Sequence, residues 1–481
     1  MNAPLRRVAL AVFVLFGMLF ANLNYVQFVK GSELRRNPIN KRVQLQEYDR
    51  KRGSIAVGSE AIALSDATND KLKYLRRYPA NSLYAHVVGF KSVTYGETGL
   101  ERSEDPILSG DDDRLFVRRV SGILTGHKTV GGDVVLTLDK GVQEAAQTAL
   151  VGRKGAIAAI DPRTGAILGL ASGPTFDPNP LSSHDYETEK KAYAKLSADP
   201  DKPMLNRALR QTYPPGSTFK VIVSSTAVKD GMTASTTVES PDRYTPPQTN
   251  KFIENFHGES CGGPSITMKV ALTVSCNTAF AKLGNKLGAD KIRATAKDFG
   301  FEQDNLQIPL AVSASQLGAM DDPPKVAQSS IGQRDVRMTP LQGAMIAAAV
   351  ANNGSLMRPH LIQEIQAPDR STLEPEQVGE MSRPLTPEQA AQVQDMMVGV
   401  VQSGTGKKAQ INGIVVGGKT GTAEDGDSRA DHSWFIGYAI KDGVAVGAVA
   451  VVLENAGTSS KSTAGLAGDV LRAIIDKQRP R

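Results

Sequence analysis

The segment Asn206–Lys220, NRALRQTYPPGSTFK, decides how the rest of the chain is interpreted. Two prolines and a glycine at 214–216 form a stiff turn, which can end one segment and begin a helix at Ser217. Residues three apart lie on one face of a helix, so Ser217 and Lys220 are predicted to be neighbours. A serine hydroxyl beside an amine is one arrangement that makes a nucleophile. Taken alone, however, Ser-x-x-Lys fits an ordinary helix start better, with a serine cap and a solvated lysine.

Two further motifs favour a nucleophilic Ser217 over an ordinary helix start. Ser275-Cys276-Asn277 follows downstream, and Lys419-Thr420-Gly421-Thr422 lies at the end of an apolar strand. Ser-x-x-Lys, Ser-x-Asn and Lys-Thr-Gly, in this order, are the three signatures of penicillin-recognising serine enzymes. The three motifs together predict an enzyme in which Ser217 is acylated.

The residue types suit the chemistry of such an enzyme. The hydroxyl of Ser217 needs a base, and no histidine stands in a triad context, so Lys220 is the candidate. A lysine can act as a base only if its pKa falls, which burial and a second cation, Lys419, would both promote. Ser275 can relay the proton to the leaving amine, and Asn277 offers a donor and an acceptor to a peptide substrate and to Lys220.

The Lys-Thr-Gly motif suits substrate binding. Lys419 and the hydroxyls of Thr420 and Thr422 are predicted to hold a terminal carboxylate. Gly421 would let the substrate backbone approach the strand edge closely. The backbone N–H groups of Ser217 and Thr422 are expected to form the oxyanion hole.

The N-terminus predicts a membrane anchor. Two arginines precede an apolar run that extends, with a few polar interruptions, over residues 8–29, about the ~20 residues that a bilayer requires. No good cleavage site follows, although a cleaved signal peptide remains an alternative. The arginines place residues 1–7 in the cytoplasm and the body of the chain outside.

The composition excludes several classes of function. The formal net charge is only +6 over 481 residues, and no basic block is interleaved with aromatic residues, so no nucleic-acid partner is expected. The six histidines are scattered without metal-ligand spacing, and we predict neither a metal site nor a cofactor.

The order of elements predicts an α/β (α+β) fold. Residues 31–130 are polar and rich in turns and are expected to form a small β-rich pedestal or docking module. Residues 131–481 are expected to form the catalytic domain. There, strands near 134–138 and 155–172, many helices from 217 to 353, strands from 415 and a last helix at 463–476 predict an antiparallel sheet flanked by helices.

The chain resembles the class B penicillin-binding proteins, which are peptidoglycan D,D-transpeptidases anchored in the cytoplasmic membrane. The likeness extends beyond the three motifs to RGSI, YPANSLYAHVVGF, GLERSEDPILSG, VVLTLDKGVQEAAQ, IGQRDVRMTPLQGAMIAAAVANNG, SGTGKKA and HSWFIGYA. The short N-terminal module and the Ser-Cys-Asn triplet are most like the actinobacterial penicillin-binding protein A group. The resemblance implies a transpeptidase fold, stem peptides ending in D-Ala-D-Ala as substrates, and acylation by β-lactams.

Alternative functions and partners remain open at this point. A D,D-carboxypeptidase or a β-lactamase would carry the same three motifs, although the anchor and the N-terminal module favour the transpeptidase. A non-catalytic penicillin sensor or division scaffold is the alternative of another class. The resemblance also implies a cell-wall polymerase and division or elongation proteins as partners, without deciding between septation, elongation and sporulation.

Cys261 and Cys276 are the only two cysteines of the chain. Both would lie on the oxidising side of the membrane, and the loop HGESCGGPS around Cys261 is flexible enough to bring the sulfurs together. We predict a disulfide beside the active site, and the alternative is two separate thiols with Cys276 as a small buried residue.

Overall fold

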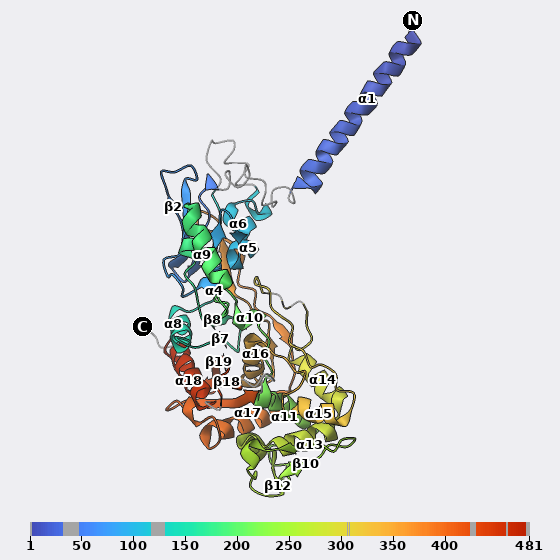
Figure 1. Ribbon diagram of the computed structural model, residues 1–481, viewed down its shortest axis with the longest axis vertical. Helices are drawn as coiled ribbons and strands as arrows, with labels where there is room; N and C mark the ends of the chain where they lie inside the picture. The colour runs from blue at the N-terminus through green and yellow to red at the C-terminus, as the bar shows by residue number, and fades with distance from the viewer. Residues whose placement is uncertain are drawn as a thin grey trace.

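A computed structural model describes residues 2–31, 48–116, 130–304, 306, 308–423, 430–457 and 460–477. Helix α1 (Asn2–Asn24) and the π-helical turn η1 (Tyr25–Val29) stand apart from the body of the molecule (Figure 1). The stretch Leu5–Gln27 is long and apolar enough to cross a membrane, and none of it is buried against the rest of the protein. The predicted apolar span is therefore present as a helix.

A five-stranded antiparallel sheet forms the centre of the larger part of the body. Its strand order is β17-β18-β19-β7-β8. The strands are β7 (Gly155–Ile160), β8 (Ile167–Gly173), β17 (Val415–Ala423), β18 (His432–Lys441) and β19 (Val444–Leu453). Strand β17, which carries the Lys-Thr-Gly motif, is an edge strand, so one of its sides is not used for pairing within the sheet.

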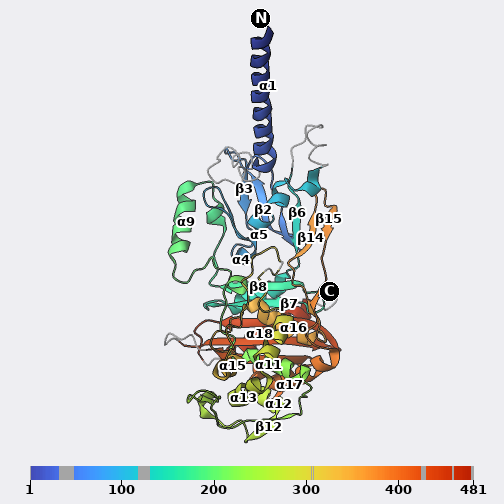
Figure 2. The same ribbon diagram turned by 90° about the vertical axis from the view of Figure 1, so that its right-hand side faces the viewer.

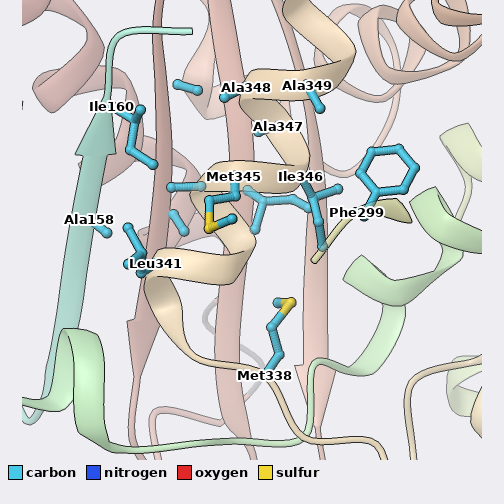
Figure 3. Packing of buried hydrophobic residues seen from close by; sticks show 14 of the residues in the cluster. Ala158, Ile160, Phe299, Met338, Leu341, Met345, Ile346, Ala347, Ala348 and Ala349 are labelled. Atoms are coloured by element: carbon cyan, nitrogen blue, oxygen red, sulfur yellow. The ribbon is translucent and has the colours of Figure 1, made fainter. Parts of the chain in front are cut away.

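Both faces of this sheet are covered by helices, because its strands are apolar on both sides. In β7, Ala158 and Ile160 pack towards α16 (Pro340–Ala351), while Ile157 and Ala159 pack on the opposite side with α8 (Lys140–Ala149) and α18 (Ser460–Lys477). Figure 3 shows α16 lying across the first face, with Leu341 and Met345 directed at the strands. The predicted antiparallel sheet flanked by helices is confirmed.

Local signals in the sequence account for several of these elements. Asp139 accepts a hydrogen bond from Val142 N and caps α8, as its position before an amphipathic helix predicts. The turn at 161–165 joins β7 and β8 into the predicted hairpin. The last helix, expected at 463–476, forms as α18.

The remaining helices pack around the active-site side of the sheet or on the N-terminal module (Figure 2). Those of the catalytic region are α10 (Arg207–Arg210), α11 (Lys220–Lys229), α12 (Met268–Thr273), α13 (Asn277–Leu287), α14 (Ala289–Asp298), α15 (Pro323–Ser330) and α17 (Pro387–Gln402). Those beside the module are α4 (Ala85–Val88), α5 (Gly99–Ser103), α6 (Asp105–Ser109) and α9 (Tyr186–Ala198).

A second sheet of six strands forms the N-terminal module and includes strands from the catalytic region. Its order is β15-β14-β6-β1-β2-β3. The strands are β1 (Ile55–Val57), β2 (Glu60–Ala67), β3 (Tyr74–Arg77), β6 (Asp133–Leu136), β14 (Ile362–Gln366) and β15 (Thr372–Pro375). Half of the sheet thus comes from beyond residue 130. The module is β-rich, as expected, but a single boundary at 130/131 does not separate its strands from the rest of the chain.

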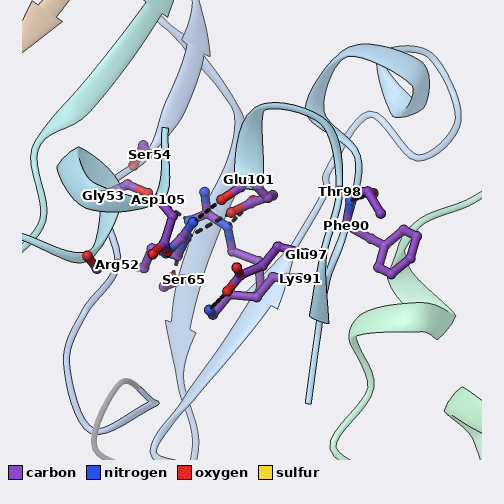
Figure 4. A network of polar contacts seen from close by, with 12 residues as sticks. Arg52, Gly53, Ser54, Ser65, Phe90, Lys91, Glu97, Thr98, Glu101 and Asp105 are labelled. Atoms are coloured by element: carbon purple, nitrogen blue, oxygen red, sulfur yellow. Dashed lines mark hydrogen bonds and ion pairs between the residues drawn. The ribbon is translucent and has the colours of Figure 1, made fainter. Parts of the chain in front are cut away.

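A buried ionic network holds the module together (Figure 4). The carboxylate of Glu101 is fully buried and accepts hydrogen bonds from Arg52 Nε at 2.8 Å and Arg76 Nε at 2.6 Å. Arg52 also pairs with Asp105. These contacts join the chain entering β1, strand β3 and the helices α5 and α6. The network links segments that are distant in sequence.

Candidate active site

Ser217 lies in a 3-10 turn, η4 (Gly216–Phe219), that continues directly into α11. A helix was expected to begin at Ser217, and it does so with this tighter turn. Residues three apart eclipse one another in a 3-10 turn, so Ser217 and Lys220 still share a face. Ser217 is half-buried at the cleft, whereas Lys220 is fully buried.

The turn before Ser217 is fixed from several sides. Gly216 has φ +53°, a conformation that favours glycine, and a Cβ there would lie 2.3 Å from Thr422 O. Gly216 N donates to Gly332 O at 2.9 Å, and Trp434 Nε1 donates to Pro214 O at 3.0 Å. The serine turn is therefore held against the edge strand β17.

The Ser-x-Asn triplet occupies the junction between α12 and α13. Ser275 has φ +61°, which is uncommon for a residue with a side chain and costs energy that the surroundings must offset. Lys220 Nζ donates to Ser275 O at 2.8 Å and to Asn277 Oδ1 at 2.7 Å, and lies 3.3 Å from Ser275 Oγ. Asn277 Nδ2 donates to Glu254 O at 3.2 Å. The structure thus brings Lys220, Ser275 and Asn277 together.

Strand β17 brings the third motif to the same place. Lys419 is fully buried, and its Nζ donates to Ser275 Oγ and to Thr420 O, both at 2.9 Å. A Cβ at Gly421 would lie 2.7 Å from Pro215 O. This glycine is therefore required by the packing of the strand on the serine turn, a different reason from the substrate approach suggested by the sequence.

Burial lowers the pKa of both lysines, as the sequence predicted for Lys220. The pKa of Lys220 is well below its usual 10.5, mainly because burial removes water from the ammonium group and secondly because Lys419 repels it. Burial lowers the pKa of Lys419 to about 7. Burial therefore favours the neutral amine of Lys220, while Lys419, with a pKa of about 7, is only partly charged at neutral pH.

The predicted residues surround a cleft of about 280 Å³. Its walls include Ser217, Cys261, Ser275, Cys276, Asn277, Thr420, Gly421 and Thr422, and the two lysines lie buried beside it. Sequence reasoning missed Asn255, Gln333 and Thr405, which also line the cleft. Thr405 Oγ1 hydrogen-bonds Thr420 Oγ1 at 2.5 Å. Thr405 lies in the quoted segment SGTGKKA, but no periodicity or spacing singles it out.

Cys261 and Cys276 are joined as a disulfide with a Cα–Cα distance of 5.8 Å. Both residues are buried. The bridge ties the loop before α12 to the triplet that carries Ser275 and Asn277. Asn255 Oδ1 supports the same junction by accepting a hydrogen bond from Thr278 N at 3.1 Å.

No group of three or more His, Cys, Asp or Glu residues that could hold a metal ion occurs within the described part of the chain.

Two family models match this chain. The penicillin binding protein transpeptidase domain matches residues 155–476, and the penicillin binding protein A dimerisation domain matches residues 52–134. The chain belongs to the penicillin-binding protein family. These matches confirm the family and, with the antiparallel sheet flanked by helices, the fold that the sequence predicted.

Individual penicillin-binding proteins resemble the chain over nearly its whole length. Peptidoglycan D,D-transpeptidase PbpA of Mycolicibacterium smegmatis is 42% identical, over 99% of this chain and 98% of the relative. PbpA of Mycobacterium tuberculosis is 40% identical over 99% of both chains. The crystal structure of PBPA from M. tuberculosis superposes with a TM-score of 0.85 at 38% identity, covering 89% of this chain and all of that one. The same protein as a penicillin G acyl-enzyme complex gives a TM-score of 0.83, covering 89% and 99% of the two chains at 38% identity.

Proposed function

We propose that this penicillin-binding protein is a peptidoglycan D,D-transpeptidase that forms its acyl-enzyme at Ser217. The observation that carries the proposal is the convergence of Lys220 and Lys419 on one hydroxyl, Ser275 Oγ, beside a serine at a helix start. The names of the relatives reported above and the penicillin G acyl-enzyme of a structural neighbour support the same activity.

In the acylation step, neutral Lys220 takes the proton of Ser217 Oγ. The oxygen attacks the carbonyl carbon of the penultimate D-Ala, and the peptide bond to the terminal D-Ala breaks. The proton reaches the leaving amine through Ser275 Oγ, and an ester remains on Ser217. An amine of a second stem peptide then attacks the ester, which forms the cross-link and frees Ser217.

In the part of the chain that the structure describes, Lys220 Nζ donates to Ser275 and Asn277 and not to Ser217 Oγ. Catalytic hydrogen bonds are often long in empty sites and tighten when substrate binds. The shared face of the 3-10 turn supports the role of Lys220, since it places the two groups on the same side.

The oxyanion hole is proposed to consist of the N–H groups of Ser217 and Thr422. Thr422 O faces Gly216, away from β18. The N–H and C=O of one residue in an antiparallel strand point to the same side. Thr422 N–H therefore also points away from β18, towards the serine turn and the cleft that Thr422 lines. The unpaired side of β17 thereby offers main-chain partners to an extended peptide.

Lys419, Thr420 and Thr422 are proposed to hold the terminal carboxylate of the peptide or the drug. The bound carboxylate would raise the pKa of Lys419 from about 7, because an opposite charge favours the ammonium form. The ammonium form of Lys419 would then be favoured when a carboxylate is bound.

The anchor is proposed to place residues 1–7 in the cytoplasm and the catalytic region outside, on the strength of Arg6 and Arg7. The N-terminal module is proposed as a pedestal and docking surface for a cell-wall polymerase and division or elongation proteins. We also propose that residues 31–130 carry no catalytic group and that all catalytic groups lie within residues 131–481.

Mass spectrometry of protein treated with penicillin tests the site, with the adduct expected on the peptide that contains Ser217. Covalent labelling that survives in Ser217→Ala would reject the assignment. Incubation with a D-Ala-D-Ala peptide and an amino-acid acceptor tests the reaction. Formation of the acceptor adduct supports a transpeptidase, while hydrolysis alone indicates a carboxypeptidase.

A further inference from the structure

A second hollow of about 830 Å³ adjoins the catalytic cleft. Ile331 and Gln333 line both spaces, and Tyr213 and Pro214, just before the serine turn, line the hollow. Five cationic side chains and one carboxylate are in its wall: Lys154, Lys202, Arg207, Arg334, Arg337 and Glu454. The hollow is therefore basic, and it is much larger than the cleft.

Three of these cations already have acidic partners. Arg207 Nε pairs with Glu454 at 2.9 Å, and Lys154 lies 3.3 Å from both Glu454 and Asp201. Arg334 pairs with Asp335. The acidic partners offset the positive charge of these three side chains, so they attract an anionic ligand only weakly.

The other two cations have no acidic partner within 4 Å in the part of the chain that the structure describes. Half-buried Arg337 donates from Nη1 only to the backbone oxygens of Arg334 and Val336. Lys202 is exposed at the rim of the hollow. Arg337 presents a planar fork of donors, the geometry that recognises a carboxylate.

The position of the hollow shows which part of a substrate would reach it. In the proposed function the leaving end of the donor peptide lies at Lys419 and Thr420. Thr405, which hydrogen-bonds Thr420, lines the cleft but not the hollow, as far as the described residues show. The Thr420 end of the cleft is therefore the end away from the hollow. The hollow joins the cleft at Ile331 and Gln333. A donor whose carboxylate occupies the Thr420 end would extend its preceding residues towards this junction.

We propose that the hollow is a subsite for a carboxylate carried by the donor peptide on the N-terminal side of the scissile bond, with Arg337 as its main partner. The inference rests on the proposed function for the direction of the donor. The same subsite takes a carboxylate on the acyl side chain of a β-lactam, because that side chain precedes the reacting carbonyl in the same way.

Two matched penicillins test the subsite with the full-length protein. One carries an adipoyl side chain that ends in a carboxylate, and the other carries the carboxamide of the same length. The readout is the ratio of their second-order acylation rate constants. The carboxylate form is expected to react about tenfold faster, the size of one partly exposed charge-assisted hydrogen bond. The ratio is expected to fall towards one in Arg337→Gln and to decrease with added salt in the unaltered protein.

Arg210→Gln is the matched control, because Arg210 is exposed on α10, loses the same charge and is not among the residues that line the hollow. It should keep the full ratio. Lys202→Gln provides a second variant, with a smaller decrease, if Arg337→Gln does not fold. A ratio of one in the unaltered protein, or a ratio that Arg337→Gln and Arg210→Gln lower equally, would overturn the subsite.

The outcome is independent of cross-linking, since both penicillins report on acylation alone. Loss of the rate preference in a protein that still cross-links peptides would reject only the subsite. A preserved, Arg337-dependent preference in a protein that forms no cross-links would support the subsite and reject the proposed reaction.

Discussion

Lys419 Nζ donates a hydrogen bond to Ser275 Oγ at 2.9 Å, which joins the edge strand of the sheet to the helical side of the cleft. Lys220 Nζ approaches the same hydroxyl at 3.3 Å from beneath the serine turn. The hydroxyl of Ser275 thus lies between two buried amines. If both lysines were charged, their ammonium groups, each within hydrogen-bond distance of one oxygen, would repel each other strongly. The arrangement favours one neutral and one charged lysine.

Lys220→Arg is expected to reduce penicillin acylation by roughly a hundredfold to ten-thousandfold. Arginine stays protonated and cannot accept the proton of Ser217, whereas the loss of a general base typically costs 10²–10⁴-fold. Stopped-flow or gel-based acylation kinetics measure the effect. Lys419→Arg should be milder, because it keeps a cation near Thr420. Equal and small losses in both variants would show that the proposed division of roles is wrong.

The pH dependence of acylation is expected to be bell-shaped. The rate should fall at acid pH, since Lys220 becomes protonated below its lowered pKa. It should also fall as the pH rises above about 7, because Lys419 loses the charge that holds the drug carboxylate. Second-order acylation rate constants in the free enzyme report these two groups.

Lys419→Arg separates the two limbs of that profile. Arginine remains charged throughout the accessible range, so the alkaline limb should disappear while the acid limb stays. An alkaline limb that persists unchanged in this variant would assign it to another group.

Removal of the Cys261–Cys276 bridge is expected to destabilise the protein by up to about 3 kcal/mol, the chain-entropy value for a loop of this size. The double variant Cys261→Ala/Cys276→Ala should also acylate more slowly, because the junction carrying Ser275 and Asn277 becomes less fixed. Urea unfolding and acylation rates measure the two effects. Thiol counting on unreduced, denatured protein is the control, and two free thiols would contradict the bridge.

Glu101→Gln is expected to destabilise the molecule by about 3–5 kcal/mol, because it leaves Arg76 buried without its carboxylate and leaves Arg52 with Asp105 alone. Thermal unfolding measures the loss. Glu60→Gln, which removes the exposed pair with Lys140, is the control and should change stability by less than about 1 kcal/mol. Similar small changes in both variants would mean that the buried network contributes little.

The elements that were predicted from sequence depend on local signals. Asp139 before an amphipathic stretch predicts the cap of α8, and the turn at 161–165 between apolar runs predicts the hairpin. The three motifs predict a shared site because their chemistry requires contact, although they are distant in sequence. The structure brings the side chains of all three motifs together in this way.

Other features depend on long-range contacts that no local pattern records. The left-handed backbone of Ser275 lies at the junction of α12 and α13, and no local sequence pattern predicts it. The contact of Trp434 with Pro214 and that of Thr405 with Thr420 arise only when β17 and β18 meet the serine turn. Strand β14 pairs with β6, which lies more than two hundred residues earlier, and β15 joins the sheet only through β14, so no local pattern predicts their place in the module.

The six-stranded sheet has a consequence for the order in which the molecule can be made. Strand β6 is flanked by β1 on one side and by β14 on the other, so the sheet is incomplete until residues 362–366 have been synthesised and can pair. Until then β6 has an open strand edge, and such an edge can pair with a wrong partner. A chimaera that exchanges the N-terminal module between relatives would have to exchange β14 and β15 with it.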